Sequence, residues 1–80
     1  MRIRWELDTN TWSATAFSDH SPIRYHLVVE RLPDQHAWDW TVWRGAASHA
    51  VRIGTALDAL TAMEAAEASV RELDNPRIDT

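Results

Sequence analysis

The sequence predicts a two-layer α+β domain, in which an antiparallel β-meander of four or five strands is covered on one face by a single C-terminal helix. Most of the chain alternates apolar and polar residues in short runs separated by turn-forming residues, which is typical of half-buried strands. After residue 55 the apolar residues recur at steps of three and four, which indicates one face of a helix. Because an apolar sheet face and an apolar helix stripe each need a cover, we expect them to pack together.

Four segments alternate clearly and are expected to form consecutive strands. The side chains predicted to face the helix are Ile3, Trp5 and Leu7 in the first segment, Trp12, Ala14 and Ala16 in the second (11–17), Ile23, Tyr25, Leu27 and Val29 in the third (23–31), and Trp38, Trp40 and Val42 in the fourth (37–44). The intervening segments 8–11, 18–22 and 33–36 contain the Asp, Asn, Ser and Pro residues that favour turns. Residues 45–48 form a further turn, and residues 49–53 are a candidate fifth strand.

Residues 55–73 are predicted to form the helix. Its apolar stripe is expected to consist of Leu57, Leu60, Met63, Ala66, Val70 and Leu73. The segment is rich in alanine, which has the highest helix propensity. Thr55 is the predicted N-cap, and Asp58 stands where the second residue of a capping box would stand. Glu64 and Glu67 are expected on the solvent side.

Composition limits the chain to one domain, predicted over residues 1–75, with residues 76–80 expected to fray. The sequence contains no cysteine, so neither a disulfide nor a cysteine-based zinc site is expected, and this fits a reducing cytoplasm. No apolar run approaches the roughly 20 residues that cross a bilayer, and the N-terminus lacks the apolar segment of a signal peptide. We therefore expect a cytoplasmic protein without a membrane partner.

The net charge is −4, and the excess of acidic residues lies after residue 53. A nucleic-acid-binding domain normally carries a basic patch or a high isoelectric point. The sequence therefore disfavours tight binding to a nucleic-acid duplex.

The residues needed for several kinds of catalysis are missing. Cysteine nucleophiles are excluded, and the only glycines, Gly45 and Gly54, cannot form a phosphate-binding loop. The serines lie in turns or exposed positions, and the histidines lack the spacing of a zinc site. We expect no catalytic residue, cofactor or metal, and only a pocket that joins His26 to Glu30 or Asp39 would favour an enzyme.

One aromatic residue breaks the alternation of the fourth strand. Trp43 shares its face with Asp39 and Thr41, so it is expected on the outer face of the sheet. Tryptophan and arginine are enriched at the centres of protein interfaces. The predicted contact residues on the outer face are Trp43, Val28, Phe17, Arg24 and His26. The sequence thus predicts a non-enzymatic protein-interaction module, whose commonest partner would be a second copy in a two-fold homodimer.

The alternative is a protein that binds single-stranded nucleic acid. Aromatic side chains on a sheet face can stack on bases while arginines follow the backbone. The residues available for this are Trp43, Phe17, Arg2, Arg4 and Arg24. Three carboxylates expected on the same face oppose it, namely Glu6, Glu30 and Asp39. Cross-strand ion pairs between these carboxylates and the arginines, Arg52 included, are the simpler expectation.

Short motifs in the second half of the chain carry a resemblance. They are Trp38-Asp39-Trp40-Thr41-Val42, Gly54-Thr55-Ala56 and Ala62-Met63-Glu64-Ala65-Ala66-Glu67. The pattern resembles a loose group of small uncharacterised bacterial and phage-borne α+β proteins, with a Trp-x-Trp-x-Val strand and an Ala-Met-x-x-Ala-Glu helix. The likeness covers roughly residues 12–67 and implies a fold, without an activity that could be transferred to any residue.

Overall fold

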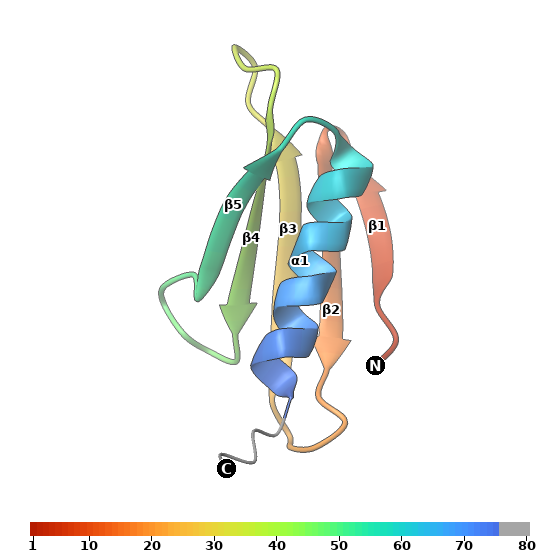
Figure 1. The fold of residues 1–80 in the computed structure, drawn as a ribbon, viewed down its shortest axis with the longest axis vertical. Coiled ribbons are helices and arrows are strands. Elements are labelled where there is room, and N and C mark those ends of the chain that lie inside the picture. The colour runs from red at the N-terminus through yellow and green to blue at the C-terminus, as the bar shows by residue number, and fades with distance from the viewer. Residues whose placement is uncertain (76–80) are drawn as a thin grey trace.

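The chain forms one five-stranded antiparallel sheet with a helix packed on one of its faces (Figure 1). The structure is a computed structural model that describes residues 1–75, so the expected fraying of residues 76–80 lies outside the described residues. In chain order the elements are β1 (Arg4–Asp8), β2 (Thr11–Phe17), β3 (Arg24–Arg31), β4 (Trp38–Arg44), β5 (Arg52–Ala56) and α1 (Ala59–Asp74). The strands pair in sequence order, which confirms the predicted meander and the two-layer α+β class.

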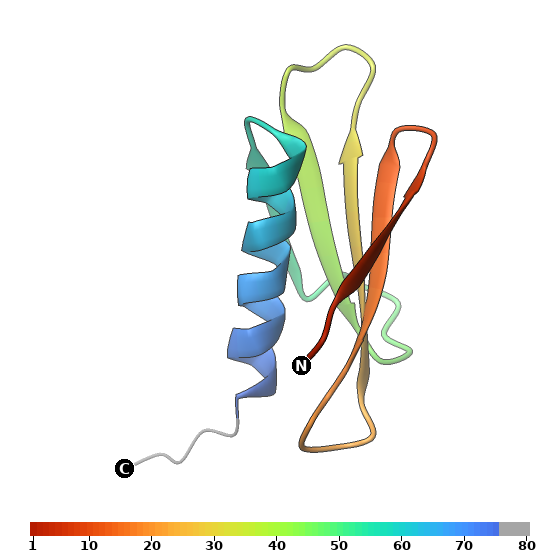
Figure 2. The same cartoon turned by 90° about the vertical axis from the view of Figure 1, so that its right-hand side faces the viewer.

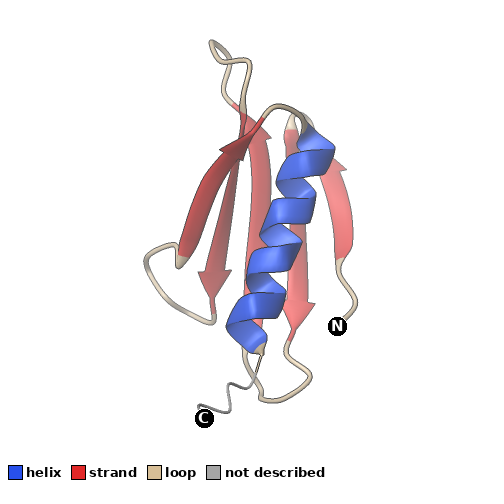
Figure 3. Cartoon of the chain, in the orientation of Figure 1, coloured by secondary structure: helices blue, strands red, loops and turns tan. Residues whose placement is uncertain are grey.

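The two layers are distinct when the molecule is turned on its side (Figure 2). Helix α1 packs against β3, β4 and β5, and it runs along the strands, as Figure 3 also shows. The opposite face of the sheet is not covered by any part of residues 1–75. No helix among these residues is both long enough and apolar enough to cross a membrane.

The core lies between the helix and the inner face of the sheet. Its buried side chains are Ala14, Ala16, Tyr25, Leu27, Val29 and Val42 from the sheet and Ala62, Ala66 and Val70 from the helix. The sheet residues are those that alternation assigned to the inner face, so the predicted strand parity is confirmed. Small alanine side chains bring α1 close to the sheet, and the space beside them is filled by larger residues such as Trp40.

The predicted start of the helix is wrong. Thr55 lies in β5 and pairs with Asp39 of β4. The N-cap is Asp58, whose carboxylate accepts a 2.7 Å hydrogen bond from the backbone N–H of Thr61. The segment that follows Gly54 forms strand hydrogen bonds with β4 before the helix begins. The fifth strand therefore ends at Ala56, later than the predicted 49–53.

The predicted apolar stripe of the helix is also partly wrong. Leu57 precedes the helix and is 87% exposed, and Leu60 in the first turn is 65% exposed. The buried stripe runs instead through alanine and valine at four-residue steps, Ala62, Ala66 and Val70. Leu57 lies before the first helical residue, and Leu60 lies two residues before Ala62, about 200° around the helix from it, so neither side chain faces the sheet.

Two side-chain hydrogen bonds join the layers. The indole Nε1 of Trp5 donates to Glu67 Oε2 at 2.7 Å, so Glu67 faces the sheet, contrary to the expectation that it lies on the solvent side. The Tyr25 hydroxyl donates to Asp74 Oδ1 at 3.2 Å. Burial, and then the negative charge of Asp74, raise the pKa of Tyr25. These bonds attach β1 and β3 to the second half of α1.

Gly54 is required by a close approach between β4 and β5. It pairs with Trp40, and a Cβ atom at position 54 would overlap the Trp40 indole ring. We expect Gly54→Ala to displace this ring and to lower the free energy of unfolding by about 1–3 kcal/mol. In a Trp40→Leu background the same substitution should cost much less, because the obstructing ring is gone. Chemical denaturation of the four variants tests this, and equal costs in both backgrounds would contradict it.

The position of the N-cap gives a second prediction. Asp58→Ala should lower the melting temperature, whereas Thr55→Ala, at the residue that the sequence indicated, should leave it almost unchanged. The bond from Thr61 holds the pKa of Asp58 below its usual range. The cap therefore contributes fully above the ordinary carboxyl pKa of about 3.9, and its contribution is lost as pH falls through the lowered pKa. Thermal melts between pH 7 and 2 should show the melting temperatures of the wild type and Asp58→Ala converging at the acidic end.

Candidate protein-interaction surface

The uncovered outer face of the sheet is the candidate functional surface. Because strand pairing fixes which residues lie side by side, its outward side chains form four rows that cross the strands. The first row contains Phe17 and Arg24; the second contains Arg4, Thr15, His26 and Trp43; the third contains Glu6, Ser13, Val28, Thr41 and Ile53; the fourth contains Asp8, Thr11, Glu30, Asp39 and Thr55.

Charge is segregated along the strands of this face. The arginines Arg4 and Arg24, together with His26, lie in the first and second rows. The carboxylates lie in the third and fourth rows and are Glu6, Asp8, Glu30 and Asp39. The outer face therefore has a basic end and an acidic end.

Within the described part of the chain, the cross-strand ion pairs expected for Arg4 and Arg24 do not form. Arg4 lies opposite Thr15 and Arg24 lies opposite Phe17. Among residues 1–75, the ion pairs join the N-terminal amino group to Asp19 and Arg71 to Glu67, and neither is on the outer face. Like charges, in contrast, do meet across strands, because the register places Glu30 directly opposite Asp39.

Arg52 was expected on the outer face, and this expectation is wrong. The register pairs it with Val42, whose side chain is buried beneath the helix, so Arg52 belongs to the other face. Its exposed guanidinium donates to the carbonyl oxygen of Val51 at 2.8 Å. The face of Arg52 is therefore set by the register between β4 and β5.

The centre of the outer face is apolar. Trp43 follows the buried Val42 and therefore lies on the outer face, directly beside His26 and diagonally beside Val28. Ile53, across from Thr41 in β5, is 73% exposed and extends this apolar centre. Phe17 is 64% exposed but lies two strands away from Trp43, next to Arg24.

The structure thus brings together Trp43, Val28 and His26 from the predicted set, with Arg24 one row beyond, and separates Phe17 from them. It also adds Ile53, which the sequence reasoning missed. The sequence carries no local signal for this, because Ile53 is placed on the Trp43 face by the pairing of β4 with β5.

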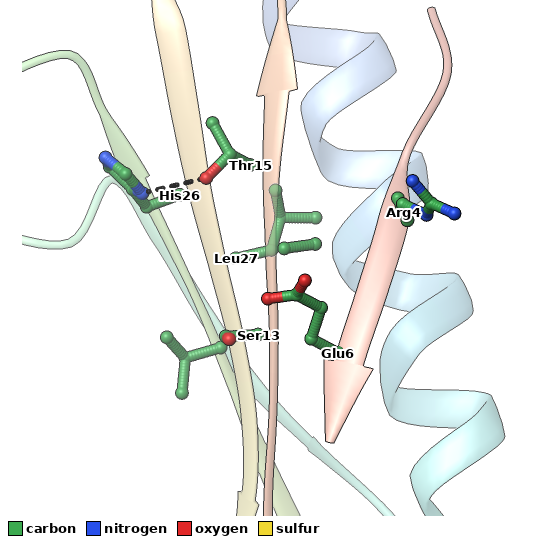
Figure 4. A pocket seen from close by; sticks show the side chains of 8 residues that line it. Arg4, Glu6, Ser13, Thr15, His26 and Leu27 are labelled. Carbon is green, nitrogen blue, oxygen red and sulfur yellow. Dashed lines mark hydrogen bonds between the residues drawn. The ribbon is translucent and has the colours of Figure 1, made fainter. Parts of the chain in front are cut away.

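Two hollows lie on this face. The first, of about 330 Å³, is centred over β2, because the short side chains of Ser13 and Thr15 stand between Arg4 and Glu6 on β1 and His26 on β3 (Figure 4). The second, of about 290 Å³, lies over β4 and is lined on the outer side by Glu30, Asp39, Thr41, Ile53 and Thr55. The outer face therefore presents both projecting side chains and recesses.

The arrangement that would favour an enzyme is not found. His26 lines the first hollow, where its ring Nδ1 lies 3.4 Å from Thr15 Oγ1. Glu30 and Asp39 line the second hollow instead. Within residues 1–75, no group of three or more His, Asp or Glu side chains is placed to hold a metal ion.

Comparisons with protein-family models, with curated proteins and with solved structures find no match for this chain. The functional conclusion therefore depends on the geometry and charge of the outer face.

The opposed carboxylates of the fourth row give a stability prediction. Asp39→Asn removes the repulsion with Glu30 and should raise the free energy of unfolding by up to about 1 kcal/mol at low ionic strength. The gain should shrink in high salt, where exposed charges are screened. Glu64→Gln, the same charge change on the exposed side of α1, is the control and should have little effect. A gain from Asp39→Asn no larger than that of the control would contradict the repulsion.

Proposed function

We propose that the protein is a non-enzymatic protein-interaction module that acts through the outer face of its sheet, with a second copy of the chain as its partner. The observation that carries the proposal is the apolar centre of the outer face, where Ile53 is exposed and Trp43 and Val28 are half-buried. An antiparallel sheet that faces water on one side normally alternates to polar residues there. Tryptophan at such a centre is the residue type that contributes most to protein association. The proposal includes a cytoplasmic location.

The shape of the face supports a macromolecular partner. Pockets for small ligands enclose most of the ligand surface. Here the two hollows open side by side onto one face and are separated by Val28 and Thr41 at the border between them. A partner surface that carries its own projections can fill both hollows and cover the apolar centre at once.

A single-stranded nucleic acid remains the alternative ligand, with Trp43 and the arginines of the first two rows as its contacts. A strand that crossed the face toward the acidic end would meet Glu30 and Asp39, which repel phosphate. The alternative therefore has only the basic end available. Quenching of tryptophan fluorescence by an oligonucleotide at low salt would support it.

Light scattering of the purified protein tests the proposal. The wild-type chain should self-associate at high micromolar concentration, and Trp43→Glu should give a monomer, because it places a charge at the apolar centre. Leu60→Glu is a matched control, since it introduces the same charged residue at an exposed leucine on α1, in the other layer. Circular dichroism establishes that each variant is folded. A wild-type monomer at these concentrations would rule out the homodimer.

A further inference from the structure

We infer that two copies pack outer face on outer face with their rows in reverse order, so that the basic end of each copy covers the acidic end of the other. The inference rests on the proposed function and specifies the geometry of the partner. It follows from the separation of Arg4 and Arg24 from the carboxylates of the third and fourth rows.

Symmetry leaves two simple arrangements. Copies that meet through the same face are related by a two-fold axis that lies in the plane between the sheets. An axis along the strands and over β3 keeps the rows in order and places Arg24 on the partner's Arg24 and Glu30 on the partner's Glu30. An axis across the strands reverses the rows and places opposite charges together. Like charges brought together at an interface strongly oppose association, so the second arrangement is favoured.

The register then assigns individual contacts. With the axis between the second and third rows, Arg24 of the first row lies over the partner's Glu30 of the fourth row on the same strand. Arg4 of the second row lies over the partner's Glu6 of the third row. Each contact occurs twice. None of these four charged side chains forms an ion pair within residues 1–75, so all four are available to the partner.

The relief of the face fits the same arrangement. Trp43 lies in the second row of β4, so the reversal places it over the third row of the partner's β4, at Thr41. Thr41 lines the second hollow between Ile53 and Glu30. Each copy would therefore insert its largest outward side chain into the other's recess over β4.

The size of the face sets the expected strength. Five strands about 4.8 Å apart, crossed over about seven residues of 3.3 Å, give a flat footprint of roughly 550 Å². Stable dimers bury about 800 Å² on each partner, so this interface lies at the small end of the range. We therefore expect dissociation constants in the micromolar range, which sedimentation equilibrium can measure.

Exchanged charges test the geometry. Arg24→Glu alone places two carboxylates together, its own and that of the partner's Glu30, and Glu30→Arg alone places two arginines together. Each variant should therefore self-associate at least about tenfold more weakly than the wild type. In an equimolar mixture of the two, both contacts regain opposite charges, and a heterodimer of wild-type strength should form. The same recovery is expected when Arg4→Glu is mixed with Glu6→Arg.

A mismatched mixture is the control. Arg24→Glu mixed with Glu6→Arg has the same net charges as the matching mixture, but it leaves two like-charged contacts unrelieved and should not recover. Recovery in this control equal to that of the matching mixture, or single variants that associate like the wild type, would overturn the reversed row order. If the single charge variants associated like the wild type but Trp43→Glu still prevented association, the outer face would remain the contact surface. A wild-type monomer would overturn both the row order and the homodimer.

Discussion

The fold depends on one constraint, which is that a single helix covers a sheet wider than itself and covers it on one face only. An α-helix with its side chains is about 10–12 Å across, whereas five strands span roughly 20 Å or more. Alanine and valine on α1 allow a close approach to β3, β4 and β5. The flanks are filled from the sheet side, where Trp5 and Trp40 pack against the core. The two tryptophan side chains therefore cover parts of the inner sheet face that the helix alone does not cover.

This constraint also explains the two most specific contacts of the inner layer. Trp5 belongs to the edge strand β1, beyond the strands on which α1 packs, and its indole N–H reaches Glu67 on the helix. Gly54 leaves room for the ring of Trp40 beside β5. Each contact positions a large aromatic side chain against the core between the sheet and the helix.

The outer face receives no such cover from residues 1–75, and its composition is costly for an isolated domain. Two carboxylates lie opposite each other in the fourth row, and an aromatic and two aliphatic side chains occupy the centre. A small domain has little stability in reserve, and these features are the reason for proposing a contact through the outer face. In the proposed homodimer, the separation of charges into two ends sets the relative direction of the two copies, since a surface with one basic and one acidic end is complementary to its own reversed copy.

The sequence alone determined the strand parity, the two-layer α+β class and the outward position of Trp43, because side-chain alternation and turn chemistry are local properties of the chain. The period of the last segment likewise identified the helix, though not its first residue. Only the tertiary structure decided where β5 ends, that Asp58 is the N-cap and that Glu67 bonds to Trp5, because these depend on pairing between distant segments. The same holds for the outer face. The register decides which charges meet across strands, and it adds Ile53 to the apolar centre. A register is a relation between strands, so no single segment of the sequence encodes it.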